Sequence, residues 1–191
     1  MQNHKEVIVN YSRDALLNVL QGYSLPQDKT TDVTACSELE IQEISKILDL
    51  GLPITSILYF RMGRDFVGYI HKDINLNNPK PTLVTHALNL PLIGCKEVYM
   101  KWYQQIDINI NEKPFGGPSV GAPTPLLNYN NSKCIDEVHC NYANLVNIVD
   151  WHAIENRSLE EYGHLISLRF EPHTEKSANI YDHLSVLGLL F

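Results

Sequence analysis

Two residues at strand spacing have the side chains that hold a divalent metal ion. His71 and Asp73 lie in the run GYIHKD, residues 68–73 of this 191-residue chain. In an extended strand, residues i and i+2 point to the same face, so the imidazole and the carboxylate project together while Lys72 points away. A metal ion needs at least one more protein ligand. The pattern therefore predicts half of a metal site and requires a partner elsewhere in the chain.

His152 is the candidate partner. It follows the apolar segment Leu145–Val149, so we expect it at the end of a buried strand. Two histidines and one carboxylate form the facial triad of non-haem Fe(II) oxygenases, which leaves open positions on the metal. The same three ligands can hold Zn²⁺ and activate a water molecule for hydrolysis. A third reading is a non-catalytic, cupin-like binding domain in which the histidines are structural.

The elements that must position these residues are mostly strands. After residue 53 the chain contains short segments rich in Ile, Val, Tyr and Phe, separated by turn residues, which is typical of a β-sandwich or barrel. We expect strands at Ile54–Arg61, Phe66–His71, Thr82–Leu90, Glu97–Tyr103, Ile106–Ile110, Leu145–Val149 and His164–Glu171.

The flanking segments are predicted to be mixed. We expect a strand at Glu6–Tyr11 and a helix from Ser12 to about Gln21, followed by a polar connector to residue 34. Ser37 and Glu40 form a capping box that starts a second helix, which Gly51 and Pro53 end. The tail Ala178–Phe191 is expected to be a helix that covers an open edge or a second copy of the chain in a homodimer.

The segment Lys113–Pro125 is rich in glycine and proline and lacks the G-K-[S/T] of a phosphate-binding loop. It is either a long surface connection or a flap beside a site.

Four short motifs, in this order, resemble the 2-oxoglutarate- and Fe(II)-dependent oxygenases, with the aspartyl/asparaginyl β-hydroxylase-like branch the nearest. They are HKD (71–73), ALNLPL (87–92), HAIEN (152–156) and ISLRF (166–170). The resemblance covers roughly residues 54–171. It implies a double-stranded β-helix, a jelly-roll or cupin-like fold of two facing antiparallel sheets. We therefore expect a mainly β single domain over residues 1–191, with an N-terminal extension (1–53), a core (54–171) and a C-terminal helix (172–191).

The resemblance also implies roles for individual residues. His71, Asp73 and His152 would bind Fe(II), and a basic residue early in the last core strand would pair with the distal carboxylate of 2-oxoglutarate. The family's usual basic position is occupied here by a tyrosine. We favour His164 for this role by its position in the sequence and keep Arg169 as the substitute, because Arg is always charged and binds a carboxylate with two hydrogen bonds. In an ideal strand the two lie on opposite faces, so only one of them can point inward.

Other residues could support this site or simply pack in the core. Asn89, flanked by leucines, must hydrogen-bond something if it is buried, and a cosubstrate carboxylate is one candidate. The candidate pocket residues are His86, Tyr99, Trp102 and Trp151. The remaining histidines, at positions 4, 139, 173 and 183, lack partners at useful spacing, and we expect them to be solvated.

Composition limits the partners and the compartment. With 15 Lys+Arg against 22 Asp+Glu, the net charge of −7 disfavours nucleic acid and acidic membranes. No apolar run reaches the length of a membrane span or signal peptide, so we expect a soluble, cytoplasmic protein. The four cysteines form no C-x-x-C pair and are expected to be reduced thiols, mostly buried. The expected partner is a small-molecule or peptide substrate with an amino-acid-like group.

Overall fold

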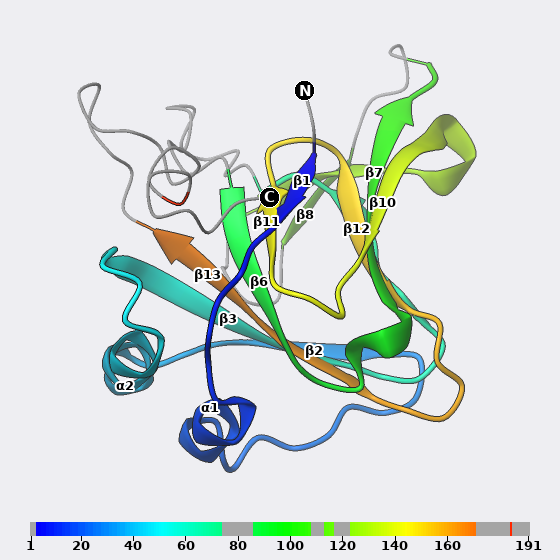
Figure 1. The fold of residues 1–191 in the computed structure, drawn as a ribbon. Helices are drawn as coiled ribbons and strands as arrows, with labels where there is room; N and C mark the ends of the chain where they lie inside the picture. The colour runs from blue at the N-terminus through cyan, green and yellow to red at the C-terminus, as the bar shows by residue number, and fades with distance from the viewer. Residues whose placement is uncertain (1–2, 74–85, 108–112, 117–122, 171–183, 185–191) are drawn as a thin grey trace, which may run out of the picture.

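A computed structural model describes residues 3–73, 86–107, 113–116, 123–170 and 184. In this part of the chain the protein is mainly β, and the strands form two antiparallel sheets (Figure 1). The first sheet has the order β1 (His4–Glu6), β11 (Asn144–Asn147), β6 (His86–Ile93), β13 (Gly163–Phe170), β3 (Ile54–Met62), β2 (Thr31–Ala35). The second has the order β10 (Ser132–His139), β7 (Val98–Gln105), β12 (His152–Asn156), β5 (Ile70–His71), β9 (Pro123–Leu127), β8 (Lys113–Gly116), and β4 (Phe66–Val67) pairs with β12. The described α-helices are α1 (Arg13–Val19) and α2 (Glu38–Leu48).

The strands pair in a nested order. β3 pairs with β13, β5 with β12, β6 with β11 and β7 with β10. The stretch from β3 to β7 therefore pairs along its length with the stretch from β10 to β13. These two stretches form one long hairpin. Because it is wrapped around itself, β6 also pairs with β13 and β7 also pairs with β12. As a result, β5 and β12, which are far apart in sequence, lie side by side.

Alternation along the strands divides the apolar residues between two layers. Leu165 packs between the two sheets with Trp102 and Met100 of β7. The next residue, Ile166, points to the opposite face of β13 and packs with residues of α1 and α2. The two helices therefore cover the outer face of the first sheet (Figure 1), and the space between the sheets holds a separate core.

The two predicted N-terminal helices are confirmed, together with their caps. The Ser12 side chain accepts a hydrogen bond from the N–H of Ala15 at the start of α1. At the start of α2, Ser37 and Glu40 form the reciprocal capping box. α2 ends at Asp49, which adopts the left-handed conformation two residues before Gly51.

Ser37→Ala is expected to lower the free energy of unfolding by about 1 kcal/mol, because it leaves N-terminal amides of α2 without their acceptor. Urea unfolding followed by circular dichroism measures the change. The matched control is Gln42→Ala on the exposed middle of the same helix, expected to stay within about 0.5 kcal/mol of the parent. Equal stability of the two variants would contradict the contribution of the cap.

Several sequence predictions are wrong in detail. The strand in this region is β1 (His4–Glu6), which shares only Glu6 with the expected Glu6–Tyr11, because the chain leaves the sheet edge after Val7, whose N–H donates to the carbonyl of Ala143 (2.9 Å). Part of Lys113–Pro125 is not a loop: β8 and β9 pair at an edge of the second sheet, where proline is tolerated. The strands β2, β10 and β12 were not predicted. Residues 82–85, 108–110, 117–122 and 171 of the expected segments lie outside the described residues.

The predicted tail helix also lies outside the described residues, except for Leu184, which is helical and buried. All four cysteines are free, and three are buried, as expected for reduced thiols. Within the described ranges, no helix has both the length and the apolar character needed to cross a membrane.

Candidate metal centre

Strand pairing brings the two predicted histidine ligands together. His71 ends β5, and His152 begins β12 instead of ending the preceding strand as predicted, because a turn separates it from β11. The two histidines are direct partners in the antiparallel pair β5–β12. Their ring centroids are 4.5 Å apart. On the other side of β12, the partner of His152 is Trp102, a fully buried residue of the core between the sheets. Because cross-strand partners project from the same face, both imidazoles lie on the inner face of the second sheet.

Asp73 completes the cluster two residues after His71. Its backbone N–H donates to the carbonyl of Ile148 (2.9 Å), which ties this segment to the end of β11. Its Oδ1 lies 3.3 Å from Nε2 of His71 and 3.9 Å from Nε2 of His152. One donor atom from each of the three residues lies within 4.8 Å of the other two. Ligand atoms bound to one ion at about 2.1 Å are up to about 4.2 Å apart, so small side-chain movements suffice to enclose a metal.

Both imidazoles are held in the tautomer that a metal requires. Nδ1 of His71 lies 2.9 Å from the carbonyl oxygen of Tyr69, and Nδ1 of His152 lies 2.8 Å from that of Asp150. A carbonyl only accepts, so each Nδ1 carries a proton, and Nε2 is the nitrogen left to bind a metal. Such second partners fix the ring orientation in metal-binding histidines.

The electrostatic environment favours the metal-binding charge states of His152 and Asp73, whereas at His71 the hydrogen bond and the charge of Asp73 outweigh burial and raise the pKa. Burial, together with the nearby charge of His71, lowers the pKa of His152 to about 4. Burial alone would raise the pKa of Asp73, but the hydrogen bond from His71 and the charge of Arg169 hold it far below its usual value. At neutral pH, His152 is therefore neutral and Asp73 is ionised. Those are the forms that bind a divalent ion.

A guanidinium group lies beside the three residues. Nη2 of Arg169, on β13, donates to Oδ2 of Asp73 (2.9 Å), the oxygen that does not face the histidines. Its Nη1 donates to Oγ of Ser167, and that hydroxyl donates to Oδ1 of Asn89 (2.5 Å each). A chain of hydrogen bonds thus runs from Asn89 along the inner face of the first sheet to Asp73.

The position of β5 depends on a close backbone approach. The predicted strand Phe66–His71 is divided into β4 and β5 around Gly68, whose N–H donates to the carbonyl of Ile154 on β12 (2.9 Å). A Cβ at residue 68 would lie 2.5 Å from that carbonyl oxygen. Tyr129 donates to the Gly68 carbonyl (2.7 Å) from the other side. Only glycine fits between these contacts, which place β5 and therefore His71.

His164 lies on the face of β13 opposite Arg169. Its Nδ1 is 2.8 Å from the hydroxyl of Tyr59, and Tyr59 belongs to the core under the helices. Burial and the positive charge of Arg61 lower the pKa of His164. The preference for His164 over Arg169 near the site is therefore wrong, although the prediction that the two occupy opposite faces is confirmed.

Among the predicted pocket residues, Trp102 is next to the cluster and two others are turned away. Trp151 packs on the outer face of the second sheet with Ile70, and the Lys72 ammonium lies 4.4 Å from its ring centre. His86, at the start of β6, shares its face with Leu88, which packs in the outer core.

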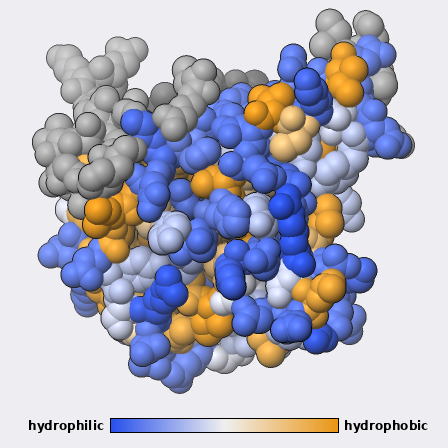
Figure 2. All heavy atoms as spheres, turned by 45° about the vertical axis from the view of Figure 1, so that its right-hand side comes forward, coloured by the Kyte–Doolittle hydropathy of each residue, from blue (hydrophilic) through white to orange (hydrophobic). Residues whose placement is uncertain are grey.

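Tyr99 lies on the outer face of the second sheet, where charged side chains cover the strands. The guanidinium of Arg157 lies 3.8 Å from the centre of its ring. Nearby, Lys101 pairs with the buried carboxylate of Glu155 (2.7 Å). In the described part of the face in Figure 2, hydrophobic residues are scattered among hydrophilic ones. Tyr99 therefore supports this surface rather than the candidate site.

Of the histidines expected to be solvated, His139 is exposed, but His4 is not free of partners. The His4 ring stacks on Trp102 at 5.5 Å, and its Nδ1 lies 3.6 Å from Asp136. His173 and His183 lie outside the described residues.

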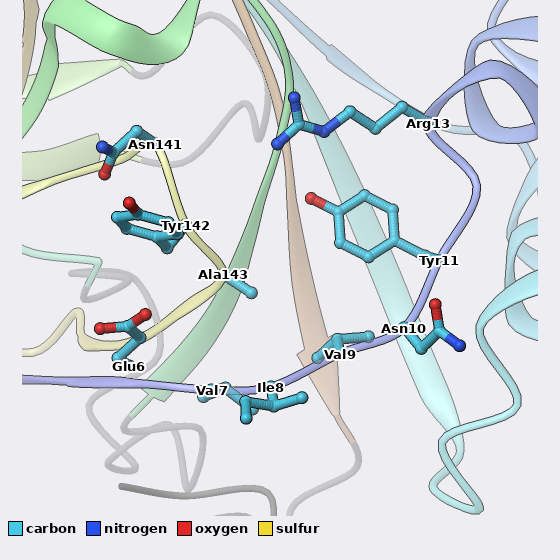
Figure 3. Close-up of a pocket in the computed structure, with 10 residues that line it drawn as sticks. All are labelled: Glu6, Val7, Ile8, Val9, Asn10, Tyr11, Arg13, Asn141, Tyr142 and Ala143. Carbon is cyan, nitrogen blue, oxygen red and sulfur yellow. The ribbon is translucent and has the colours of Figure 1, made fainter.

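Two shallow cavities in the described chain are not lined by the three candidate ligands. One, of about 310 Å³, lies between residues 6–13 and the turn at 141–143 (Figure 3). Its two tyrosines, Tyr11 and Tyr142, come from these two segments, and Tyr11 donates to the carbonyl of Pro91 (2.7 Å). The other, of about 350 Å³, includes Trp102 and Asp150 in its lining. Neither contains His71, Asp73 or His152.

Three contributors to the site were not identified from the sequence. Ser167 holds Arg169, and the carbonyl groups of Tyr69 and Asp150 orient the two histidines. Backbone acceptors carry no sequence signal. Ser167 carries a weak one, because it is the only hydroxyl residue of β13 and stands two residues before the only arginine of that strand.

The chain matches no protein-family model and shows no significant match to a curated protein. Function is therefore inferred from the geometry of the site and from the sequence motifs.

Proposed function

We propose that this protein is an Fe(II)- and 2-oxoglutarate-dependent dioxygenase that hydroxylates a peptidyl or amino-acid-like small-molecule substrate. The observation that carries the proposal is the convergence of His71, Asp73 and His152 on the inner face of the second sheet. Two imidazole nitrogens and one carboxylate fit Fe(II) and leave positions for a bidentate cosubstrate and O₂. The anchored Nδ1 atoms support a site built for metal rather than a chance cluster.

The strand pairing supports a double-stranded β-helix, the fold that the resemblance implies. A jelly roll is a long antiparallel hairpin wrapped so that its strands distribute over two facing sheets. The nested pairs β3–β13, β5–β12, β6–β11 and β7–β10 follow this scheme. In the proposed fold, β5, the segment that follows it and β12 carry the metal ligands, and β13 carries the cosubstrate arginine.

Arg169 supports the use of an anionic cosubstrate. A guanidinium has five N–H donors, and the hydrogen bonds to Asp73 and Ser167 use two of them. The remaining donors can grip a carboxylate, and Asn89 holds the serine that orients the arginine. A zinc hydrolase needs no fixed cation beside its metal, so Arg169 favours the oxygenase over that alternative.

When bound, Fe(II) with 2-oxoglutarate and O₂ supplies the oxidation of a C–H bond to C–OH, with release of succinate and CO₂. The chain's own residues bind and orient. His71 and His152 present their Nε2 lone pairs, and Asp73 offers Oδ1 while Arg169 occupies Oδ2. Trp102 and the surrounding apolar core exclude water from the inner side of His152.

The test is an anaerobic titration of the Fe(II)-loaded protein with 2-oxoglutarate. We expect a weak visible charge-transfer band that saturates with cosubstrate, and slow succinate formation once air is admitted. Metal analysis of protein purified without added metal tests the zinc hydrolase in parallel. The control is the same titration with succinate, which lacks the 2-oxo group and cannot chelate in the same way.

Absence of both the band and succinate formation would contradict the oxygenase. Stoichiometric zinc in the purified protein, together with no response to 2-oxoglutarate, would favour the hydrolase. Failure to bind any divalent metal would leave the non-catalytic binding domain.

A further inference from the structure

We infer that Asn147 is a positioning residue for the metal site, acting through Asp150 on His152. This role rests on the proposed metal site, which it deepens. Asn147 ends β11, and the turn that follows it leads directly into His152, the first residue of β12. Its side chain makes no contact with the three ligands. It shapes the turn that contains Asp150, and the backbone carbonyl of Asp150 accepts the hydrogen bond from the His152 ring.

The side chain of Asn147 makes three hydrogen bonds inside this turn. Its Oδ1 accepts hydrogen bonds from the N–H of Val149 (3.0 Å) and of Asp150 (3.4 Å). Its Nδ2 donates to Oδ2 of Asp150 (2.7 Å). Such side-chain to main-chain bonds impose a turn on the two following residues. Asp150 is thus held through both its backbone and its carboxylate by one buried residue, which is only 3% exposed.

The backbone of Asn147 anchors the turn to its surroundings. Its N–H donates to the carbonyl of Asn3 (2.8 Å), and its own carbonyl accepts from Nε1 of Trp102 (2.9 Å). Trp102 is also the strand partner of His152. Asn147 therefore ties the turn to the N-terminal segment on one side and to β7 beside the candidate ligand on the other.

A change in this turn affects His152 through a single hydrogen bond. The carbonyl of Asp150 accepts from Nδ1 of His152 (2.8 Å), and this bond sets both the tautomer and the ring orientation. If the turn relaxes, the carbonyl moves, the Nδ1–H loses its fixed acceptor, and Nε2 no longer points at Asp73. Loss of an outer partner of a metal-bound histidine weakens metal affinity 10- to 100-fold. Because Asn147 acts one step further out, we expect about 10-fold.

The same strand offers a matched control. Asn144 begins β11, is also nearly fully buried, and donates from Nδ2 to the carbonyls of His139 and Tyr142. It therefore has a similar side chain, burial and number of hydrogen bonds, but it contacts neither the β11–β12 turn nor any candidate ligand. Removing either asparagine is expected to destabilise the fold to a comparable extent. Only Asn147→Ala is expected to change the metal site.

The experiment is a Co²⁺ titration of the metal-free full-length chain, followed by the visible absorption of bound Co²⁺. We compare the parent with Asn147→Ala, Asn144→Ala and Asp150→Ala. Asn144→Ala is expected to keep the parent affinity and spectrum. Asn147→Ala is expected to bind about 10-fold more weakly and to show an altered spectrum. Asp150→Ala removes only an exposed carboxylate from the turn, so it should fold normally and shift the affinity in the same direction by a smaller factor.

A second readout does not depend on metal. In ¹⁵N-labelled, metal-free protein, we expect the parent and Asn144→Ala to show the Nδ1–H tautomer of His152, and Asn147→Ala to show a mixture of tautomers. Equal Co²⁺ affinity and equal His152 signals in the two asparagine variants would overturn the positioning role. If Asn147→Ala does not fold, an unchanged affinity and spectrum in Asp150→Ala overturns it. A parent protein that binds no Co²⁺ refutes the proposed metal site instead.

Discussion

His152→Ala abolishes metal-dependent succinate formation and weakens metal binding by more than about 100-fold, since loss of an outer partner alone costs up to that factor. The imidazole is one of three donors, and no other histidine or acidic residue of the described chain joins the cluster that could hold the ion. Succinate is measured by chromatography under saturating Fe(II) and 2-oxoglutarate. Metal affinity is measured separately by Co²⁺ titration.

His71→Ala is expected to give the same result. It also separates loss of a metal ligand from loss of the fold. The His71 side chain is 33% exposed, so its removal leaves a smaller packing defect than removal of the buried His152. The control is His139→Ala, an exposed histidine on β10 of the same sheet, which should retain full activity. Unchanged turnover in either ligand variant would remove the basis for the proposed site.

The candidate ligands were predictable because their signals are local. The spacing of His71 and Asp73 places two donors on one strand face, and an apolar strand before His152 indicates a buried position. The capping box at Ser37 predicted α2 for the same reason, since both partners lie within one turn. The meeting of His71 with His152 is a consequence of the long-range pairing of β5 and β12, to which no single segment points.

The unpredicted strands have a common cause. β10 has the sequence SKCIDEVH and lies at an edge of the second sheet with mostly exposed or half-buried residues, so it lacks a strong apolar signal. β8 and β9 contain prolines, which predict a loop. Tertiary pairing overrides these local preferences.

The choice between His164 and Arg169 shows what the alternation of residues along a strand cannot predict, namely which face of the strand points to the site. Alternation correctly separates the two faces of β13. The face with Ile166 and Leu168 is the more apolar, but it packs under the helices rather than between the sheets. The opposite face carries Ser167 and Arg169 toward the candidate site. The position of α1 and α2 in the fold decides which face is inner, and strand periodicity contains no information about it.

Arg169→Met raises the dissociation constant for 2-oxoglutarate about 10- to 100-fold, because hydrogen bonds to a charged group contribute about 1.5–3 kcal/mol. The binding isotherm is read from the charge-transfer band of the anaerobic Fe(II) protein. Arg169→Lys keeps the positive charge but cannot form a bidentate pair with a carboxylate, so we expect an intermediate affinity for 2-oxoglutarate. Since Arg169 also holds Asp73, Co²⁺ affinity is measured in each variant to separate loss of cosubstrate from loss of metal.

His164→Gln is the decisive comparison for Arg169. Its side chain lies on the other face of β13 against Tyr59, so the substitution can lower thermal stability but should leave 2-oxoglutarate affinity unchanged. A loss of cosubstrate affinity in His164→Gln with none in Arg169→Met would reverse the assignment. Because both residues are on β13 and pair with β3, a general disturbance of β13 would affect both variants alike. A selective effect in Arg169→Met therefore reports on the inner face, where the carboxylate of the cosubstrate must lie if the metal is held by His71, Asp73 and His152.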